Sequence, residues 1–306
     1  MRDLLNAGLN SMIGLIKIIS FFFFHATGTP MAESHTVKNN LTLLILAIAL
    51  LPAIFSDSSK AHAYDITAGA TTWYAWGKQY NYQKDKKARF NSLVESDPSF
   101  LYGPAISVKY DDDFNLTFVF LYGRFESEKS EFKRIDSDLA LNYKLNDYLK
   151  VFAGLKFLSY GVMPTKLNFF GETNFIIDDI DTHTSYGTGL GLSATVPIIE
   201  NLFGLATLSG LYLLGNQKFD IEKAIITGPP PGMHIEYRSI KIWYHEYGVN
   251  TNASIAYYIS NWSTVVSLGG RLQYIIADYK SNDIYVSSIR FLIYGMTLTA
   301  TYTFDL

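Results

Sequence analysis

Residues 138–157 read DLALNYKLNDYLKVFAGLKF, with apolar side chains alternating with polar or small ones on both sides of a short turn. The alternation runs from Leu139 up to the Asn146-Asp147 pair and resumes at Leu149. A period of two residues is typical of a β-strand, and two such runs around an Asn/Asp turn predict an antiparallel hairpin. We interpret this hairpin as one unit of a repeated plan.

The parity of this hairpin puts its lysines on one face. A turn of three residues, 145–147, suits a single left-handed position at Asn or Asp. The pairs that follow are Lys144 with Tyr148, Asn142 with Lys150 and Asp136 with Lys156, leaving Asp138 diagonal to Lys156. A lysine facing lipid near the membrane midplane costs about 2–4 kcal/mol. The polar face of the hairpin is therefore expected to point to the inside of a closed sheet.

The composition is unusual for a water-soluble domain. Of the 306 residues, 48% are hydrophobic, 15% aromatic and only 17% charged, whereas charged residues make up roughly 25% of typical soluble domains. The net charge of −3 gives no indication of nucleic-acid binding, and the absence of Cys excludes disulfides and Cys-ligated metals. No cofactor and no metal site are predicted.

The amino-terminal part has the features of an export signal. Residues 41–55 are continuously apolar, Lys38 precedes them, and Ala61-His62-Ala63 supplies small residues before Tyr64. An anchoring helix is the alternative, but it needs about 20 apolar residues. We predict that residues 1–30 are an upstream extension, that 31–63 are a signal peptide cleaved before Tyr64, and that 64–306 form one barrel domain.

Ten alternating segments follow, and they predict the fold. They lie at residues 64–76, 100–110, 114–122, two in the hairpin above, 185–196, 203–216, 246–255, 266–276 and 292–304. Tight connections alternate with longer or more polar ones, including the charged segment 124–134. An even number of strands with short turns at one end is the plan of a transmembrane β-barrel. The predicted fold class is all-β, a ten-stranded antiparallel up-and-down transmembrane β-barrel.

The carboxyl terminus resembles a known class of protein. Leu298, Ala300, Tyr302 and Phe304 alternate as in the last strand of bacterial outer-membrane β-barrels, although Asp305-Leu306 follow the expected final Phe. The resemblance implies location in the outer membrane of a Gram-negative bacterium, insertion by the barrel assembly machinery, and contact with outer-membrane lipid. A soluble periplasmic barrel is the alternative. Aromatic residues gathered at strand ends, as in membrane girdles, favour the first interpretation.

The lumen of a ten-stranded barrel is narrow and largely filled by side chains. The inward set that the alternation predicts is Lys109, Asp136, Asp138, Asn142, Lys144, Lys150, Lys156, Glu246, Asn250, Asn252, Arg271 and Gln273. Such a set favours a self-satisfied polar network, and hence a non-enzymatic structural or binding barrel. A narrow channel or transporter for small solutes or ions is the alternative function.

Two motifs raise an enzymatic hypothesis. Asp136-Ser137-Asp138 and Asp181-Thr182-His183 resemble the acid and acid–histidine pairs of the omptin proteases, which are also ten-stranded outer-membrane barrels. The resemblance implies that Asp181 and His183 would activate water at the extracellular mouth and that Asp136 and Asp138 would complete the site. His183-Thr184-Ser185 also resembles the H-x-S motif of outer-membrane lipid deacylases and phospholipases. Both resemblances cover only these residues.

Two long connections are candidates for contact with a partner. Segments 161–182 and 218–243 contain apolar runs, and the second carries Pro229 to Pro231. They predict either a lid over the mouth or a patch that holds an extracellular partner or a small ligand.

Overall fold

A computed structural model describes residues 65–83, 92–127, 130–162, 182–227, 232–279 and 286–304. The strands are β1 (Asp65–Gln83), β2 (Ser92–Glu95), β3 (Ser99–Lys109), β4 (Phe114–Ser127), β5 (Ser130–Lys144), β6 (Leu149–Val162), β7 (Thr182–Ile199), β8 (Leu202–Thr227), β9 (Gly232–Ile259), β10 (Thr264–Tyr279) and β11 (Val286–Phe304). A single 3-10 turn, η1 (Ser260–Trp262), precedes β10. The predicted extension and signal peptide lie outside these ranges.

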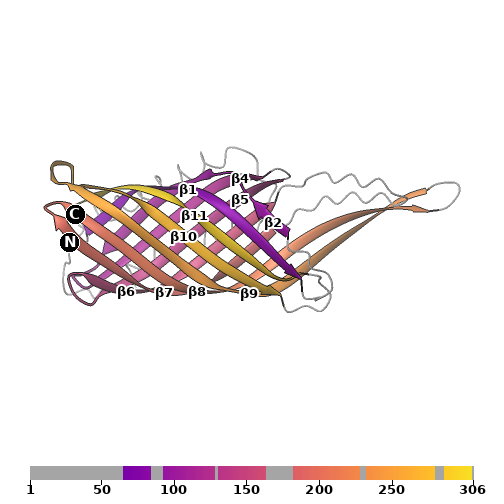
Figure 1. The fold of residues 1–306 in the computed structure, drawn as a ribbon. Helices are drawn as coiled ribbons and strands as arrows, with labels where there is room; N and C mark the ends of the chain where they lie inside the picture. Colours follow the sequence, from indigo (N-terminus) through magenta and orange to yellow (C-terminus); the bar gives the residue numbers. More distant parts are fainter. Residues whose placement is uncertain are drawn as a thin grey trace, which may run out of the picture. The chain divides into compact units, whose positions relative to one another are not determined.

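The strands form one closed antiparallel barrel (Figure 1). Ten strands pair in chain order, and β11 returns to pair with β1 along their whole length, from Ile66 opposite Phe304 to Gln83 opposite Val286. The short strand β2 adds to β1 beyond the ladder with β3. The prediction of a ten-stranded antiparallel barrel is confirmed.

Several strands continue past their predicted ends. The charged segment 124–134 was expected as a connection, but β4 and β5 pair directly as far as Ser127 opposite Ser130. Segment 218–243 was expected as a long loop, but β8 and β9 pair as far as Thr227 opposite Gly232. Ladder hydrogen bonds satisfy these backbones even where the alternation is interrupted by charges. Figure 1 shows the β8–β9 pair projecting beyond its neighbours.

The β5–β6 turn corrects the predicted register. Lys144 pairs with Lys150 and not with Tyr148, so the hairpin closes one residue later than expected. The cause is Asn146, whose side-chain oxygen accepts hydrogen bonds from the amides of Tyr148 and Leu149, each at 2.9 Å. The correction moves every pair by two residues and leaves the faces unchanged. Lys156 therefore lies directly opposite Asp138.

The outer wall of the barrel is apolar. Leucines such as Leu155 and Leu190 are 57% and 69% exposed there. Aromatic rings cluster toward the two ends of the strands: Tyr74 contacts Phe100 and Trp76, while Phe114 packs on Tyr143 at the turn end. An apolar belt between aromatic girdles is the surface of a barrel that lies in lipid. In the described ranges no helix is long and apolar enough to cross a membrane.

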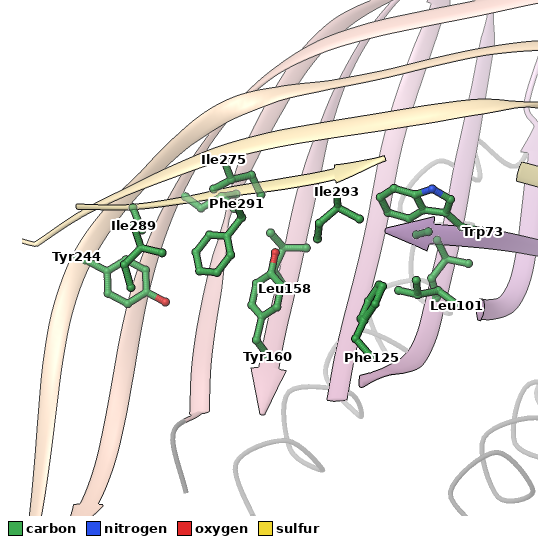
Figure 2. Packing of buried hydrophobic residues seen from close by; sticks show 14 residues of the cluster. Trp73, Leu101, Phe125, Leu158, Tyr160, Tyr244, Ile275, Ile289, Phe291 and Ile293 are labelled. Atoms are coloured by element: carbon green, nitrogen blue, oxygen red, sulfur yellow. The ribbon is translucent and has the colours of Figure 1, made fainter. Parts of the chain in front are cut away.

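The interior toward the long connections is packed with apolar side chains, which the sequence interpretation did not anticipate. Trp73, Leu101, Leu158 and Leu213 have no exposed surface, and Figure 2 shows rings such as Phe291 pointing into the enclosed space. The rest of this cluster comes from nearly every strand of the wall: Ala75, Leu121, Phe125, Tyr160, Tyr244, Ile275, Ala277, Ile289, Phe291 and Ile293. The lumen is filled as expected, but half of its filling is apolar.

Candidate lumen site

An ion-paired cluster lies in the lumen next to this apolar packing. On β5, Asp136 and Asp138 point inward, and the neighbouring β6 brings Lys156 opposite Asp138. The Lys156 ammonium nitrogen lies 2.5 Å from a carboxylate oxygen of Asp136 and 2.7 Å from one of Asp138. Lys156 thus holds both carboxylates of the D-x-D motif. We call Arg134, Asp136, Asp138, Lys156, Arg271 and Gln273 the lumen cluster.

The lumen cluster joins opposite walls of the barrel. Strands β5 and β10 do not pair, and four strands separate them on either side. The Arg271 guanidinium of β10 nevertheless reaches β5, with an Nη2 atom 3.4 Å from Asp138 and 3.6 Å from Asp136. From β5, Arg134 donates to Asp136 at 2.9 Å and to the side-chain carbonyl of Gln273 on β10. Arg271 thus reaches from β10 to β5, and Arg134 reaches from β5 to β10.

Aromatic rings flank the two guanidinium groups. The Arg271 guanidinium carbon lies 4.6 Å from the centre of the Trp73 ring, and that of Arg134 lies 4.5 Å from the Tyr160 ring. Both contacts have the geometry of a cation–π interaction. Arg134 and Trp73 have no exposed surface, and Asp136 is 1% exposed. The centre of the cluster is therefore buried, and Asp138 lies at its more exposed edge.

A second contact across the lumen lies toward the long connections. Tyr160 of β6 and Phe291 of β11 stack with their ring centres 5.2 Å apart, although their strands lie on opposite walls. His183 of β7 approaches the Tyr244 hydroxyl at 3.3 Å through Nδ1. Figure 2 shows Tyr160, Phe291 and Tyr244 gathered inside the wall. The lumen is thus obstructed at two successive levels.

Some buried polar atoms at these levels have no hydrogen-bond partner among the described residues. They include Nε and Nη1 of Arg134, the amide nitrogen of Gln273, the Ser185 hydroxyl and one oxygen of Glu246. Glu246, which is 1% exposed, lies close enough to Ser185, His183 and Arg134 to interact with them electrostatically. Atoms of this kind are ordinarily satisfied by buried water. The side chains that obstruct the lumen are therefore closely packed, and the polar atoms among them are of the kind that buried water satisfies.

The ladder registers turn all the described residues of the predicted inward set to the lumen, in two groups. Asp136, Asp138, Lys156, Arg271 and Gln273 belong to the lumen cluster, and Asn250 accepts from Arg271 at 3.0 Å. The others toward the turn end are Lys109, which pairs with Asp112 at 2.8 Å, Lys144, which pairs with Asp147 at 2.7 Å, and Asn142, which donates to the Asn115 carbonyl. Lys150, Asn252 and Glu246 face the lumen and form no ion pair among the described residues.

The residues of the enzymatic hypothesis are placed as follows. Asp136 and Asp138 are both bound by Lys156, which neutralises them. His183 faces the lumen nearer the long connections, against Tyr244. Asp181 lies outside the described residues. Ser185 and His183 are both buried inside the barrel, away from the lipid-facing wall on which the lipid hydrolases act.

Arg134, Trp73, Tyr160 and Phe291 were missed by the sequence interpretation. Arg134 stands two residues before Asp136 and four before Asp138, so its inward position follows from the same parity. It was missed because the charged segment 124–134 was interpreted as a connection. Trp73 alternates with the outward Thr72 and Tyr74, but aromatic residues were assigned to the membrane face. The alternation itself therefore places the Trp73 ring inside the barrel.

Solved structures offer likeness in fold only. The outer membrane protein AlkL, in DMPC bilayers, is 12% identical at a TM-score of 0.38, covering 82% of this chain and 95% of AlkL. Neisserial surface protein A is 10% identical at 0.33, covering 80% and 100%, and the Ail attachment invasion locus protein of Yersinia pestis is 12% identical at 0.29, covering 78% and 98%. No protein-family model and no curated protein matches the sequence. The resemblance to outer-membrane barrels holds for the fold, which rests on the closed ladder itself.

Proposed function

We propose that this protein is an integral outer-membrane barrel with a closed lumen, and that its role is structural or binding rather than enzymatic. The observation that carries the proposal is the pairing across the lumen between β5 and β10. Separating these groups would leave buried charges without partners, and loss of one partner of a buried pair costs about 3–5 kcal/mol. An open lumen is therefore higher in free energy than the closed one.

The location rests on the wall and on the amino-terminal segment. An apolar belt with aromatic girdles supports membrane insertion, and residues 31–63 support export through a cleaved signal peptide. A membrane barrel of this kind contacts outer-membrane lipid and depends on the assembly machinery for insertion. A binding role would be carried by segments 161–182 and 218–243, where the β8–β9 pair extends past the other strands.

Planar-bilayer recording tests the closed lumen. Wild-type protein is expected to give no steady conductance steps. The variant Arg134→Ala/Arg271→Ala/Tyr160→Ala/Phe291→Ala removes the groups that cross the lumen at both levels and is expected to conduct. Lys109→Ala, at the turn end and outside the lumen cluster, is the matched control and is expected to stay silent. Steady steps from the wild type would instead favour the alternative, a narrow channel, for which the buried polar atoms of the lumen are the supporting observation.

The hydrolase remains the third function. It is disfavoured because Lys156 neutralises the two acids that would form the site. If the purified protein cleaved a peptide or a lipid, and His183→Ala abolished this activity, the hydrolase hypothesis would be supported.

A further inference from the structure

The outer wall carries a groove that the closed lumen does not explain. It is an open groove of about 530 Å³ that runs over strands β7 to β10. The outward-facing residues that line it include Leu190, Gly210, Tyr212, Tyr247, Val249 and Tyr274. Volumes of 300–1,000 Å³ are usual for sites that hold a small molecule. The groove lies on the lipid side of the barrel, so whatever fills it comes from the membrane.

A missing side chain creates this groove. Leu190, Gly210, Val249 and Tyr274 are consecutive partners across four strands, and together they form one row on the outer wall. Gly210 is the only member of the row without a side chain. A Cβ atom built at Gly210 would meet nothing within 4 Å. The depression therefore results from the absence of a side chain at Gly210. Leu190 bounds it on one side and Val249 on the other.

Hydrogen-bonded polar groups lie at the end of the groove toward the long connections. The next row on the wall contains Tyr212 paired with Tyr247, whose rings border the groove. The Tyr212 hydroxyl lies 2.8 Å from Nδ1 of His245, and the Tyr247 hydroxyl donates to Asp278 at 2.9 Å. These tyrosines are about half exposed, at 52% and 43%. The groove is thus apolar along its length and polar at one end, next to the aromatic girdle. A lipid has the same arrangement, with an apolar acyl chain and a polar headgroup.

We propose that this groove holds one acyl chain of lipid A, the lipid of the outer leaflet of an outer membrane, whose phosphorylated headgroup lies against His245 and its neighbours. The chain fills the space above Gly210, between Leu190 and Val249. The headgroup phosphate accepts a hydrogen bond at the Tyr212–His245 end. The inference rests on the membrane placement proposed above. It is tested separately, because lipid binding in detergent does not depend on where the cell delivers the protein.

The test is native mass spectrometry of the full-length protein, delipidated in detergent and titrated with lipid A. The wild type is expected to form a one-to-one adduct. Gly210→Leu fills the groove and is expected to weaken that adduct about tenfold. Gly270→Leu is the matched control, because Gly270 is also exposed on the outer wall, where a Cβ would come no closer than 3.6 Å to its neighbours. Heat-modifiable mobility verifies that both variants are folded.

Equal adducts from all three proteins would overturn the inference. A protein dimer that Gly210→Leu abolishes would also overturn it, because the groove would then belong to a second copy of the chain. His245→Ala tests the headgroup position and is expected to weaken the adduct several-fold while Gly270→Leu does not. An adduct unchanged in His245→Ala would refute the placement of the headgroup.

Discussion

Lys156 shows how strongly the lumen depends on single residues. It is 2% exposed and lies between Asp136 and Asp138, which would repel each other without it. The two arginines lie on the far side of the same carboxylates, so each acid has more than one cation. The three cations and the two carboxylates form one connected network, in which Lys156 is the cation that contacts both acids most closely.

Lys156→Met is expected to lower the free energy of unfolding by about 1–3 kcal/mol, because the buried Asp136 and the partly buried Asp138 each lose a charged hydrogen-bond partner while the arginines remain beside them. The measurement is the urea midpoint of the refolded barrel, followed by heat-modifiable mobility. Lys150→Met is the control: Lys150 also faces the lumen but is only half-buried and forms no ion pair in the described ranges, so its effect should be smaller. Equal stability of Lys156→Met and the wild type would contradict the role of Lys156.

At the turn, Asn146→Ala is expected to cost about 1–2 kcal/mol, because it removes the acceptor of two backbone amides, and each such bond contributes about 0.5–1.5 kcal/mol. The same urea midpoint measures it. Asp147→Ala, whose exposed pair with Lys144 contributes little, is the control. A larger loss from Asp147→Ala than from Asn146→Ala would contradict this account of the turn.

The turn ion pair also predicts a pH dependence. The hydrogen bond from Lys144 and its charge lower the pKa of Asp147. A lowered pKa in the folded state means that the contribution is present above the ordinary Asp pKa and is lost as the pH falls through the folded value. The stability difference between the wild type and Asp147→Asn should therefore be small at neutral pH and vanish on acidification. A difference that grows on acidification would contradict the sign.

For single residues, the sequence predicts which face of the barrel wall a side chain lies on better than it predicts which residue it pairs with. Alternation has a period of two, so it assigned Lys156, Arg271 and Gln273 to the lumen regardless of the turn. The partner of each residue depends on where the turn closes, and the hydrogen bonds of Asn146 move that point by one residue. Contacts across the lumen, such as Arg134 with Gln273, join strands that are not neighbours, and no local pattern encodes them.

Among the elements, the β8–β9 pair differs from the rest. Its ladder with β7 ends at Lys218 and its ladder with β10 ends at Tyr244, so the remaining residues pair only with each other. About nine residues per strand at about 3.3 Å each project roughly 30 Å past the wall. A two-stranded ribbon is marginally stable alone. We therefore expect the barrel to fold without it.

Shortening this ribbon tests its independence. Lys218 and Lys241 are directly opposite, so replacing residues 219–240 by Asn-Gly closes the hairpin with a two-residue turn. The shortened protein is expected to retain the heat-modifiable mobility and urea midpoint of the wild type. A matched control shortens the hairpin further, to the pair Leu214–His245, which removes ladder contacts with β7 and β10 and should destabilise the barrel. Unfolding of the first variant would show that the ribbon belongs to the cooperative unit.

For the whole molecule, the two ends of the barrel differ, and this predicts its orientation. The turns at residues 110–113, 145–148, 200–201 and 260–263 lie at one end, together with the start of β1 and the end of β11, since Ile66 pairs with Phe304. Outer-membrane barrels keep short turns in the periplasm and long connections outside. Trypsin added to intact cells is expected to cut only within residues 84–91, 128–129, 163–181, 218–243 and 280–285, each of which contains a Lys or Arg. The turn lysines Lys109 and Lys144 should be cut only after the outer membrane is permeabilised, which is the internal control. Cleavage after Lys109 or Lys144 in intact cells would reverse the orientation and move the β8–β9 ribbon to the periplasmic side.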